Sequence, residues 1–181
     1  MPKIFVLKIG HRPDRDKRIS THCALVARAF GADGIILDCE DDELETRVKS
    51  VVKRFGGNFS VESGVDWRKK LRSWQDNGGT IVHLTMYGLP IHEIIGEIAA
   101  NLRDKLLVVG GPKVPRTVYE IADYNVSITQ QPHSEVASIC IFLDRYFRGA
   151  EFNREFNNAE MRIIPQGKGK LVIKRDHSTS I

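Results

Sequence analysis

The stretch Leu106–Pro115, LLVVGGPKVP, and its sequel Asn125–Glu135, NVSITQQPHSE, organise this chain of 181 residues. Each begins as an apolar run, continues as a loop of small polar residues with Pro or Gly, and leads into a segment with helical periodicity. In a parallel α/β sheet, ligands bind where the carboxyl ends of strands open into such loops. We therefore expect the two loops to follow adjacent strands and to line one pocket.

Working outward from these loops, short apolar runs alternate with amphipathic segments along most of the chain. This alternation predicts an α/β fold with a mostly parallel sheet and helices on both faces. The six predicted strands cover residues 3–10, 34–38, 58–62, 80–86, 105–109 and 124–128.

The pattern loosens after Gly149, and the apolar runs Met161–Pro165 and Leu171–Lys174 predict a short hairpin. We expect a single domain over residues 1–166, followed by a hairpin strand and a frayed tail over residues 167–181.

Composition narrows the class of protein. The three cysteines, Cys23, Cys39 and Cys140, are scattered without CxxC spacing, which favours reduced thiols and disfavours a zinc site. The chain begins with a short strand-like run rather than a signal peptide, and no apolar run reaches membrane-spanning length. These features predict a soluble, cytoplasmic protein with no membrane partner and no metal.

Charge is segregated, although the net charge is only +4. Basic residues gather between Arg12 and Arg28, at Arg68–Arg72 and at Lys168–Arg175, whereas acidic residues concentrate at Asp38–Glu45. This distribution is compatible with a nucleic-acid partner. For the second and third clusters, solvated helix faces are an equally good explanation.

Common catalytic motifs are absent from the sequence. It contains no GxxxxGK[ST], GxGxxG, HExxH or GxSxG pattern, which removes the best evidence for nucleotide, metal or hydrolase chemistry. His83, between Val82 and Leu84, is expected to be a packed core residue. What remains is a pocket of backbone groups from Gly110–Pro112 and Ile128–Gln131, which suits a flat heteroaromatic ring. The alternative is that these segments are merely tight strand-to-helix connections.

Four segments, in this order, carry a family resemblance: GHRPDRDKRISTH (10–22), VHLTMYG (82–88), VVGGPKVP (108–115) and YNVSITQQPHSEVASICIFLDR (124–145). Together they closely resemble the archaeal tRNA cytidine-56 2'-O-methyltransferases of the SPOUT superfamily, over nearly all of residues 5–166. The resemblance implies an α/β fold with a deep trefoil knot in its C-terminal part, S-adenosylmethionine bound at the knot, a tRNA substrate and a homodimer. General topology rules would have argued against a knot.

Carried over by position, the resemblance implies a cofactor site that agrees with the pocket inferred from the loops. Its residues would be Leu84, Gly110, Gly111, Pro112, Lys113, Val114, Ile128, Thr129, Gln130, Gln131, Pro132, His133, Ser134 and Glu135. The helix that follows would cover the knot and contribute to the dimer interface; an internal core helix is the alternative.

Methyl transfer to a ribose hydroxyl needs alignment and loss of one proton, but no metal. In related SPOUT enzymes an arginine after the first strand sits beside the nucleophile, where a planar, permanently charged group can fix the adjacent phosphate. The candidates are Arg12, Arg15, Arg18 and Arg28, with Arg18 preferred and Arg15 second. Simple phosphate binding is the alternative role for each. His22 and His133 are weaker candidates, as proton acceptor or RNA contact.

Two other functions remain open at this point. The same fold and cofactor could serve a different RNA ribose or a base, or the chain could be a non-catalytic dimeric RNA-binding module. The Gly110–Gly111 and Gln130–Gln131 loops argue against the module, which would have no need of a cofactor pocket.

Overall fold

The computed structural model describes residues 1–111 and 113–175, apart from the side chain of Lys17. Six strands of this part form one sheet in the order β3-β2-β1-β5-β4-β6, and every neighbouring pair is parallel. The predicted α/β class and parallel sheet are confirmed. The strands are β1 (Ile4–Ile9), β2 (Gly34–Leu37), β3 (Ser60–Glu62), β4 (Thr80–Pro90), β5 (Lys105–Gly110) and β6 (Tyr124–Ser127).

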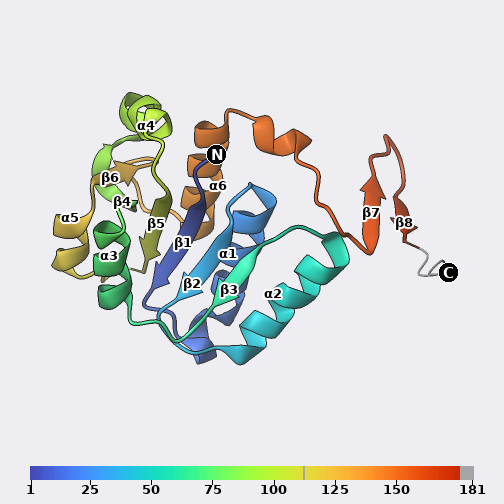
Figure 1. Cartoon of the computed structure of the whole chain (residues 1–181), viewed down its shortest axis with the longest axis horizontal. Helices are drawn as coiled ribbons and strands as arrows, with labels where there is room; N and C mark the ends of the chain where they lie inside the picture. The colour runs from blue at the N-terminus through green and yellow to red at the C-terminus, as the bar shows by residue number, and fades with distance from the viewer. Residues whose placement is uncertain (112, 176–181) are drawn as a thin grey trace.

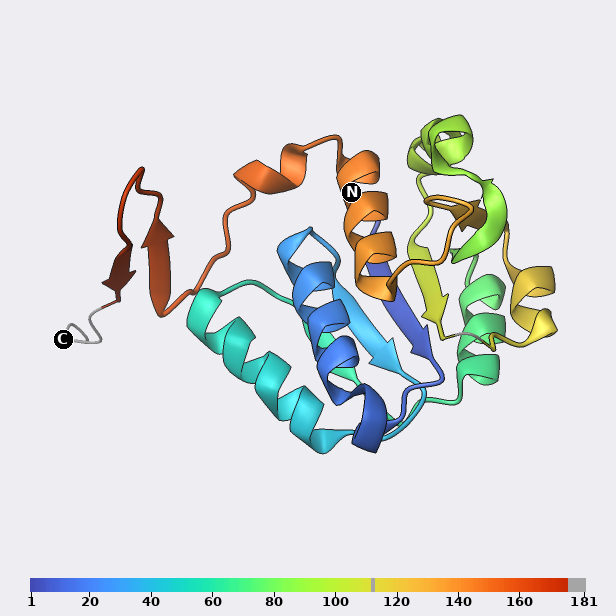
Figure 2. The ribbon, with the colours of Figure 1, turned by 180° about the vertical axis from the view of Figure 1, so that it is seen from behind.

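Helices cover both faces of the sheet, as Figures 1 and 2 show from opposite sides. Core residues of one face come from α1, α2, α4 and α6, and those of the other face from α3 and α5. The helices are α1 (Pro13–Ala29), α2 (Asp42–Phe55), α3 (Trp67–Asp76), α4 (Ile91–Ala100), α5 (Arg116–Ile121) and α6 (Glu135–Phe147), with a short 3-10 helix, η1 (Ala150–Asn153).

The central strands are buried on both sides. Along β1, Ile4 and Val6 belong to one core cluster, whereas Leu7 and Ile9 belong to the other. Successive side chains of a strand point to opposite faces, so a strand with two covered faces needs apolar residues at consecutive positions. The continuous apolar run in β5 has the same explanation.

Strand β4 is longer than the sequence predicted, because it resumes after an irregular segment. Leu84 and Leu89 both pair with Val126 of β6, so the intervening residues loop out of register. A Cβ on Gly88 would lie 2.4 Å from the backbone carbonyl carbon of Asn125. Only glycine allows this approach. The hydrophobic pattern gave no sign of it, since pairing with β6 is a tertiary event.

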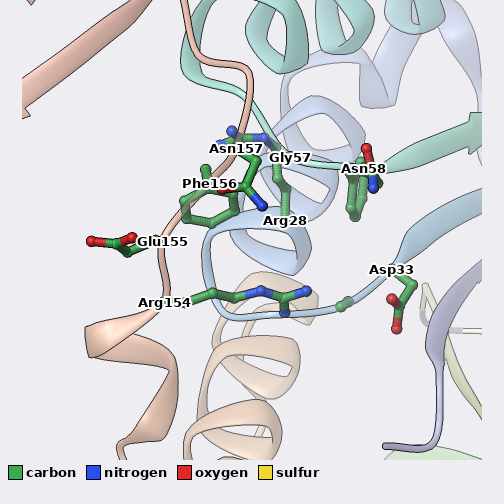
Figure 3. A pocket seen from close by; sticks show the side chains of 10 residues that line it. Arg28, Asp33, Gly57, Asn58, Arg154, Glu155, Phe156 and Asn157 are labelled. Carbon is green, nitrogen blue, oxygen red and sulfur yellow. The ribbon is translucent and has the colours of Figure 1, made fainter.

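The amino edge of the sheet holds a cavity of about 210 Å³ (Figure 3). It lies beside the segments that lead into β2 and β3. In its wall, Phe156 lies under the guanidinium of Arg28, 4.5 Å from ring centroid to Cζ, and 6.0 Å from that of Arg154. The Asn157 carbonyl accepts a hydrogen bond of 2.8 Å from the Gly57 N–H. These contacts tie residues 154–157 to the body of the fold.

The C-terminal hairpin projects from the body next to the end of α2 (Figure 1). Its strands, β7 (Met161–Ile164) and β8 (Leu171–Lys174), pair antiparallel and form a separate two-stranded sheet. The predicted hairpin is confirmed.

Candidate functional site

The two loops singled out from the sequence lie at the carboxyl edge of the sheet, but their strands are not adjacent. Strands β5 and β6 both pair with β4, which separates them. The loops therefore flank the end of the regular part of β4, where Leu84 is buried. The prediction of adjacent strands was wrong, because the sequence pattern does not reveal whether the connection from β5 leads to the neighbouring strand or past β4 to β6.

The first loop begins at Gly110, the last residue of β5, where the Val114 side chain approaches the backbone closely. A Cβ there would lie 2.6 Å from Cγ2 of Val114, a residue that packs on the core face shared with α3 and α5. Gly111, in contrast, is exposed and has no atom of the described residues within 4 Å of its Cβ position. Lys113 is exposed, and Pro112 lies outside the described residues. One glycine thus permits a close contact with Val114, and the other borders open space.

The second loop, residues 128–134, is held mainly by its own hydrogen bonds. The Gln130 side-chain amide donates to Ser127 Oγ at 2.8 Å, and the Gln131 N–H donates to Thr129 Oγ1 at 3.2 Å. Ser134 caps α6 by accepting a hydrogen bond from the Ala137 N–H at 3.2 Å.

Within this loop, Ile128 is half-buried against the core. The side chains that follow it are available at the surface: Thr129, Gln130, Gln131, Pro132, His133 and Ser134 are all exposed. The loop combines one apolar anchor with a polar surface.

An ion pair fixes the far end of this loop. Lys8 of β1 donates to both carboxylate oxygens of Glu135, at 2.9 and 3.0 Å, and its side chain is 3% exposed. Because β5 and β4 lie between β1 and β6, the loop must cross the edge of the sheet to bring Glu135 to β1. Glu135, predicted as a cofactor contact, has its carboxylate engaged by Lys8.

The first turns of α1 present arginines to solvent beside this edge. Arg15 and Arg18 are exposed and, within the described residues, make no hydrogen bond or ion pair through their guanidinium groups. Their spacing and that of exposed His22 place all three on one side of the helix. Arg12 differs, because it forms a bidentate pair with Asp16, and the hydrogen bond from Arg12 lowers the pKa of that carboxyl.

Arg28 does not belong to this group, although the sequence made it a candidate. It lies at the other end of α1, is 8% exposed, and donates to the Gly56 carbonyl. Burial lowers the pKa of its guanidinium. A helix of 17 residues is too long for both ends to reach one edge of the sheet.

His83 is a packed core residue, as the sequence predicted. Its Nδ1 lies 2.8 Å from Asn125 Oδ1, and its ring meets that of Tyr119 edge to face at 4.6 Å. Burial lowers the pKa of the imidazole, which favours the neutral form. Among the described residues, no group of three or more His, Cys, Asp or Glu side chains is placed to hold a metal ion.

Several residues near the site were missed by sequence reasoning. Lys8 interrupts an apolar strand, which is the one signal that could have singled it out. His11, Ser20 and Asp38 form hydrogen bonds with partners 9 to 30 residues away, which no local pattern reveals. Asp41 caps α2, because its side chain accepts a hydrogen bond from the Leu44 N–H.

The chain is similar to known methyltransferases. A family model described as tRNA ribose 2'-O-methyltransferase, aTrm56, matches residues 55–173. A tRNA (cytidine(56)-2'-O)-methyltransferase of Thermococcus kodakarensis is 54% identical over 94% of this chain and 97% of its own length. The protein of the same name from Methanothrix thermoacetophila is 52% identical over 96% and 98%, respectively.

Solved structures share the fold at low sequence identity. The TrmH/SpoU tRNA modifying enzyme of A. aeolicus has a TM-score of 0.61 at 16% identity, over 84% of this chain and 78% of that one. The SpoU methyltransferase AviRb from Streptomyces viridochromogenes, solved in complex with AdoMet, has a TM-score of 0.55 at 17% identity, over 82% and 58%. In the described part of this chain, no helix has the length and apolar character to cross a membrane.

Proposed function

Because the chain belongs to the aTrm56 family of tRNA ribose 2'-O-methyltransferases, we propose that it methylates the ribose 2'-hydroxyl of cytidine 56 in tRNA, with S-adenosylmethionine as methyl donor. The proposal is carried by 52% and 54% sequence identity to enzymes of that name over nearly the full length of the chain. The geometry of the carboxyl edge supports it, since two exposed loops and an arginine-bearing helix meet there.

The loops offer a fitting place for the cofactor. We assign it to Leu84, to the Gly110–Val114 loop and to residues 128–135. The space beside Gly111 would accept part of the adenosine, while Ile128 offers an apolar contact for its ring. Backbone groups around Gln130 and Gln131 would read the edge of the ring. Glu135 contributes indirectly, by fixing the end of the loop through Lys8.

S-adenosylmethionine supplies a methyl group already activated by the positive charge on sulfur. In the transfer, the ribose 2'-oxygen forms a bond to the methyl carbon while the carbon–sulfur bond breaks, and the hydroxyl proton leaves to solvent or to a nearby base. Arg18, with Arg15 as the second candidate, would hold the adjacent phosphate and stabilise the developing negative charge on the oxygen. Alignment of the reacting atoms is the main contribution of this protein.

The exposed basic side chains of α1 would meet tRNA phosphates. Neutralising phosphates releases counterions, so affinity for tRNA is expected to fall steeply as salt rises. A fluorescence-anisotropy titration of an unmodified tRNA transcript between 50 and 200 mM salt, a range in which about 6 to 10 phosphate contacts would cost about a thousandfold or more, tests this. A flat response would contradict the electrostatic account.

The trefoil knot and the homodimer are also proposals. Helix α6 packs on α1, α4 and β5, after a loop that crosses the sheet edge, as a knotted C-terminal segment would. Ile141, exposed on α6, is available for a partner subunit. A crystal structure with bound S-adenosylmethionine tests the knot, and sedimentation velocity tests the dimer; an unthreaded chain or a monomer at micromolar concentration would refute the respective proposal.

Label transfer tests the activity itself. The protein is incubated with methyl-labelled S-adenosylmethionine and unmodified tRNA, and the product is mapped by nuclease digestion and mass spectrometry. We expect label on the ribose of cytidine 56 and none when that nucleotide is a 2'-deoxy analogue. Label elsewhere would refute the assigned nucleotide, and no label with demonstrable cofactor binding would refute the tRNA substrate.

A further inference from the structure

Three buried polar side chains, those of Ser20 in α1, His11 and Asp41, form a hydrogen-bonded triad on the inner side of α1. Ser20 Oγ lies 2.7 Å from His11 Nδ1, and His11 Nε2 lies 3.0 Å from Asp41 Oδ2. The exposed fractions are 0% for Ser20, 4% for His11 and 7% for Asp41. An ionised carboxylate only accepts hydrogen bonds, so Nε2 donates to Asp41, and a neutral ring then accepts from Ser20 at Nδ1.

This order of side chains is the one that activates a nucleophilic serine in hydrolases, but Ser20 cannot play that part. Its hydroxyl lies on the buried side of α1, out of reach of any substrate. Buried polar groups that are fully hydrogen-bonded make a local structure rigid. The hydrogen bonds among Ser20, His11 and Asp41 therefore hold α1 in a fixed position.

The backbone of the same segment is held by a second carboxylate. Asp38 accepts hydrogen bonds from the N–H groups of Gly10, at 2.6 Å, and His11, at 2.9 Å. Asp41 also serves α2, because its Oδ1 accepts from the Leu44 N–H at 2.9 Å. The connection from β1 to α1 is thus clamped, through main chain and side chain, to the connection from β2 to α2.

The start of α1 lacks a side-chain cap. Its N-cap residue is Arg12, which makes no side-chain cap hydrogen bond. Ser20 and Arg18 are two residues apart, about 200° around a helix, so fixing Ser20 on the inner side orients Arg18 on the outer side. The position of Arg18 then depends on contacts with the neighbouring connection.

We propose that His11, with Ser20, Asp38 and Asp41, positions the arginine-bearing turns of α1 for methyl transfer. None of the four side chains touches the reacting atoms; they are positioning residues that act through Arg18. The proposal rests on the proposed catalytic role of Arg18, and the two can fail separately.

The test uses Ser20→Ala, the smallest change that breaks the triad. Thr80→Val is the matched control, because Thr80 is also buried and its hydroxyl accepts one hydrogen bond, from Asn101, at the opposite edge of the sheet. Asp38→Ala is the second variant, which releases the backbone without opening a cavity in the core. Single-turnover methylation of tRNA, calorimetric affinity for S-adenosylmethionine and the Tm are measured for each.

We expect Ser20→Ala and Asp38→Ala to slow methylation about 10-fold, because small misplacements of reacting groups are costly. Affinity for S-adenosylmethionine is expected to stay within about twofold, and Thr80→Val to keep the wild-type rate. An unchanged methylation rate in both Ser20→Ala and Asp38→Ala would overturn the proposal. A loss of cofactor affinity that equals the loss of rate would overturn it as well.

The double variant Ser20→Ala/Arg18→Ala separates positioning from a general effect. If Ser20 acts through Arg18, adding Ser20→Ala to Arg18→Ala lowers the rate by less than about twofold, since two residues that act as a unit are not additive. A further loss of about 10-fold would overturn the proposal. If Arg18→Ala alone keeps the wild-type rate, the failure lies instead with the assignment of Arg18.

Discussion

Several cationic side chains at the two edges of the sheet differ in what they contact. At the amino edge, the cations of Lys105, Arg28 and Arg154 donate to backbone carbonyls, and both guanidinium groups lie within 6.0 Å of the Phe156 ring centroid. At the carboxyl edge, Arg15 and Arg18 are exposed, with no partner among the described residues.

Aspartates, in contrast, accept hydrogen bonds from the backbone at both edges. At the amino edge, Asp33 and Asp104 accept hydrogen bonds from backbone N–H groups at the start of β1, and Asp123 does so for β4. At the carboxyl edge, Asp38 accepts from the connection that carries the arginines into position. A charged side chain that is hydrogen-bonded to the backbone stabilises the fold, whereas an exposed one without such a partner is available to a substrate.

Replacing Arg18 with Ala is expected to have the largest effect. If the free guanidinium stabilises the reacting oxygen, turnover falls at least about 100-fold while affinity for S-adenosylmethionine is nearly unchanged. Steady-state kinetics with tRNA and calorimetry with the cofactor provide the two values. Arg47→Ala, which removes an exposed arginine on α2, is the control and is expected to keep wild-type turnover. Wild-type turnover in Arg18→Ala would eliminate Arg18 as the catalytic residue.

Lys8 at the carboxyl edge and Lys105 at the amino edge are both buried, so replacing each lysine in turn compares the two edges. Lys8→Met leaves the Glu135 carboxylate, 16% exposed, without its partner, and we expect the free energy of unfolding to fall by about 3 kcal/mol. The affinity for S-adenosylmethionine is expected to fall as well, because the loop before α6 loses its anchor.

Lys105→Met removes hydrogen bonds to the carbonyls of Asn101 and Arg103, with an expected loss of about 1 to 2 kcal/mol and no change in cofactor affinity. Urea unfolding and calorimetry measure both effects. Equal changes of cofactor affinity in the two variants would show that the edges do not differ in this respect.

Gly111 and Gly96 both have Cβ positions that face open space, so a valine at each position can be compared. Gly111→Val is expected to leave the Tm of the free protein nearly unchanged but to weaken S-adenosylmethionine binding about 10-fold, because the side chain would occupy space assigned to the cofactor. Gly96→Val, on α4, is expected to leave that affinity unchanged. Calorimetric titration of both variants decides; unchanged affinity in Gly111→Val would move the cofactor away from Gly111.

The smallest effect concerns thiol reactivity. Burial raises the pKa of the Cys23 thiol to about 12, so at pH 8 almost none of it is the reactive thiolate. Cys39, which follows β2 at the carboxyl edge, is half-buried. In the folded protein we expect a disulfide reagent at pH 8 to modify Cys39 well before Cys23, with peptide mass spectrometry to identify the sites. Cys23 reacting first would indicate that α1 opens from the core.

Local patterns predicted much of the fold. Strand-like runs in the sequence located all six strands of the parallel sheet. The hairpin after η1 followed from two apolar runs alone. The extension of β4 and the order of β5, β4 and β6 were not predicted, because strand pairing joins residues that are far apart in sequence.

The sequence by itself determined the class of fold, the two loops rich in small and polar residues, and the basic character of the helix after β1, because hydrophobic periodicity and turn composition are local properties. Only the tertiary structure decided which charges are free. It placed Arg28 against the backbone and left Arg18 at the surface, joined Lys8 to Glu135 across 127 positions, and enclosed His11 between Ser20 and Asp41. These choices depend on what each side chain meets after folding, and that is set by the packing of elements distant in the chain.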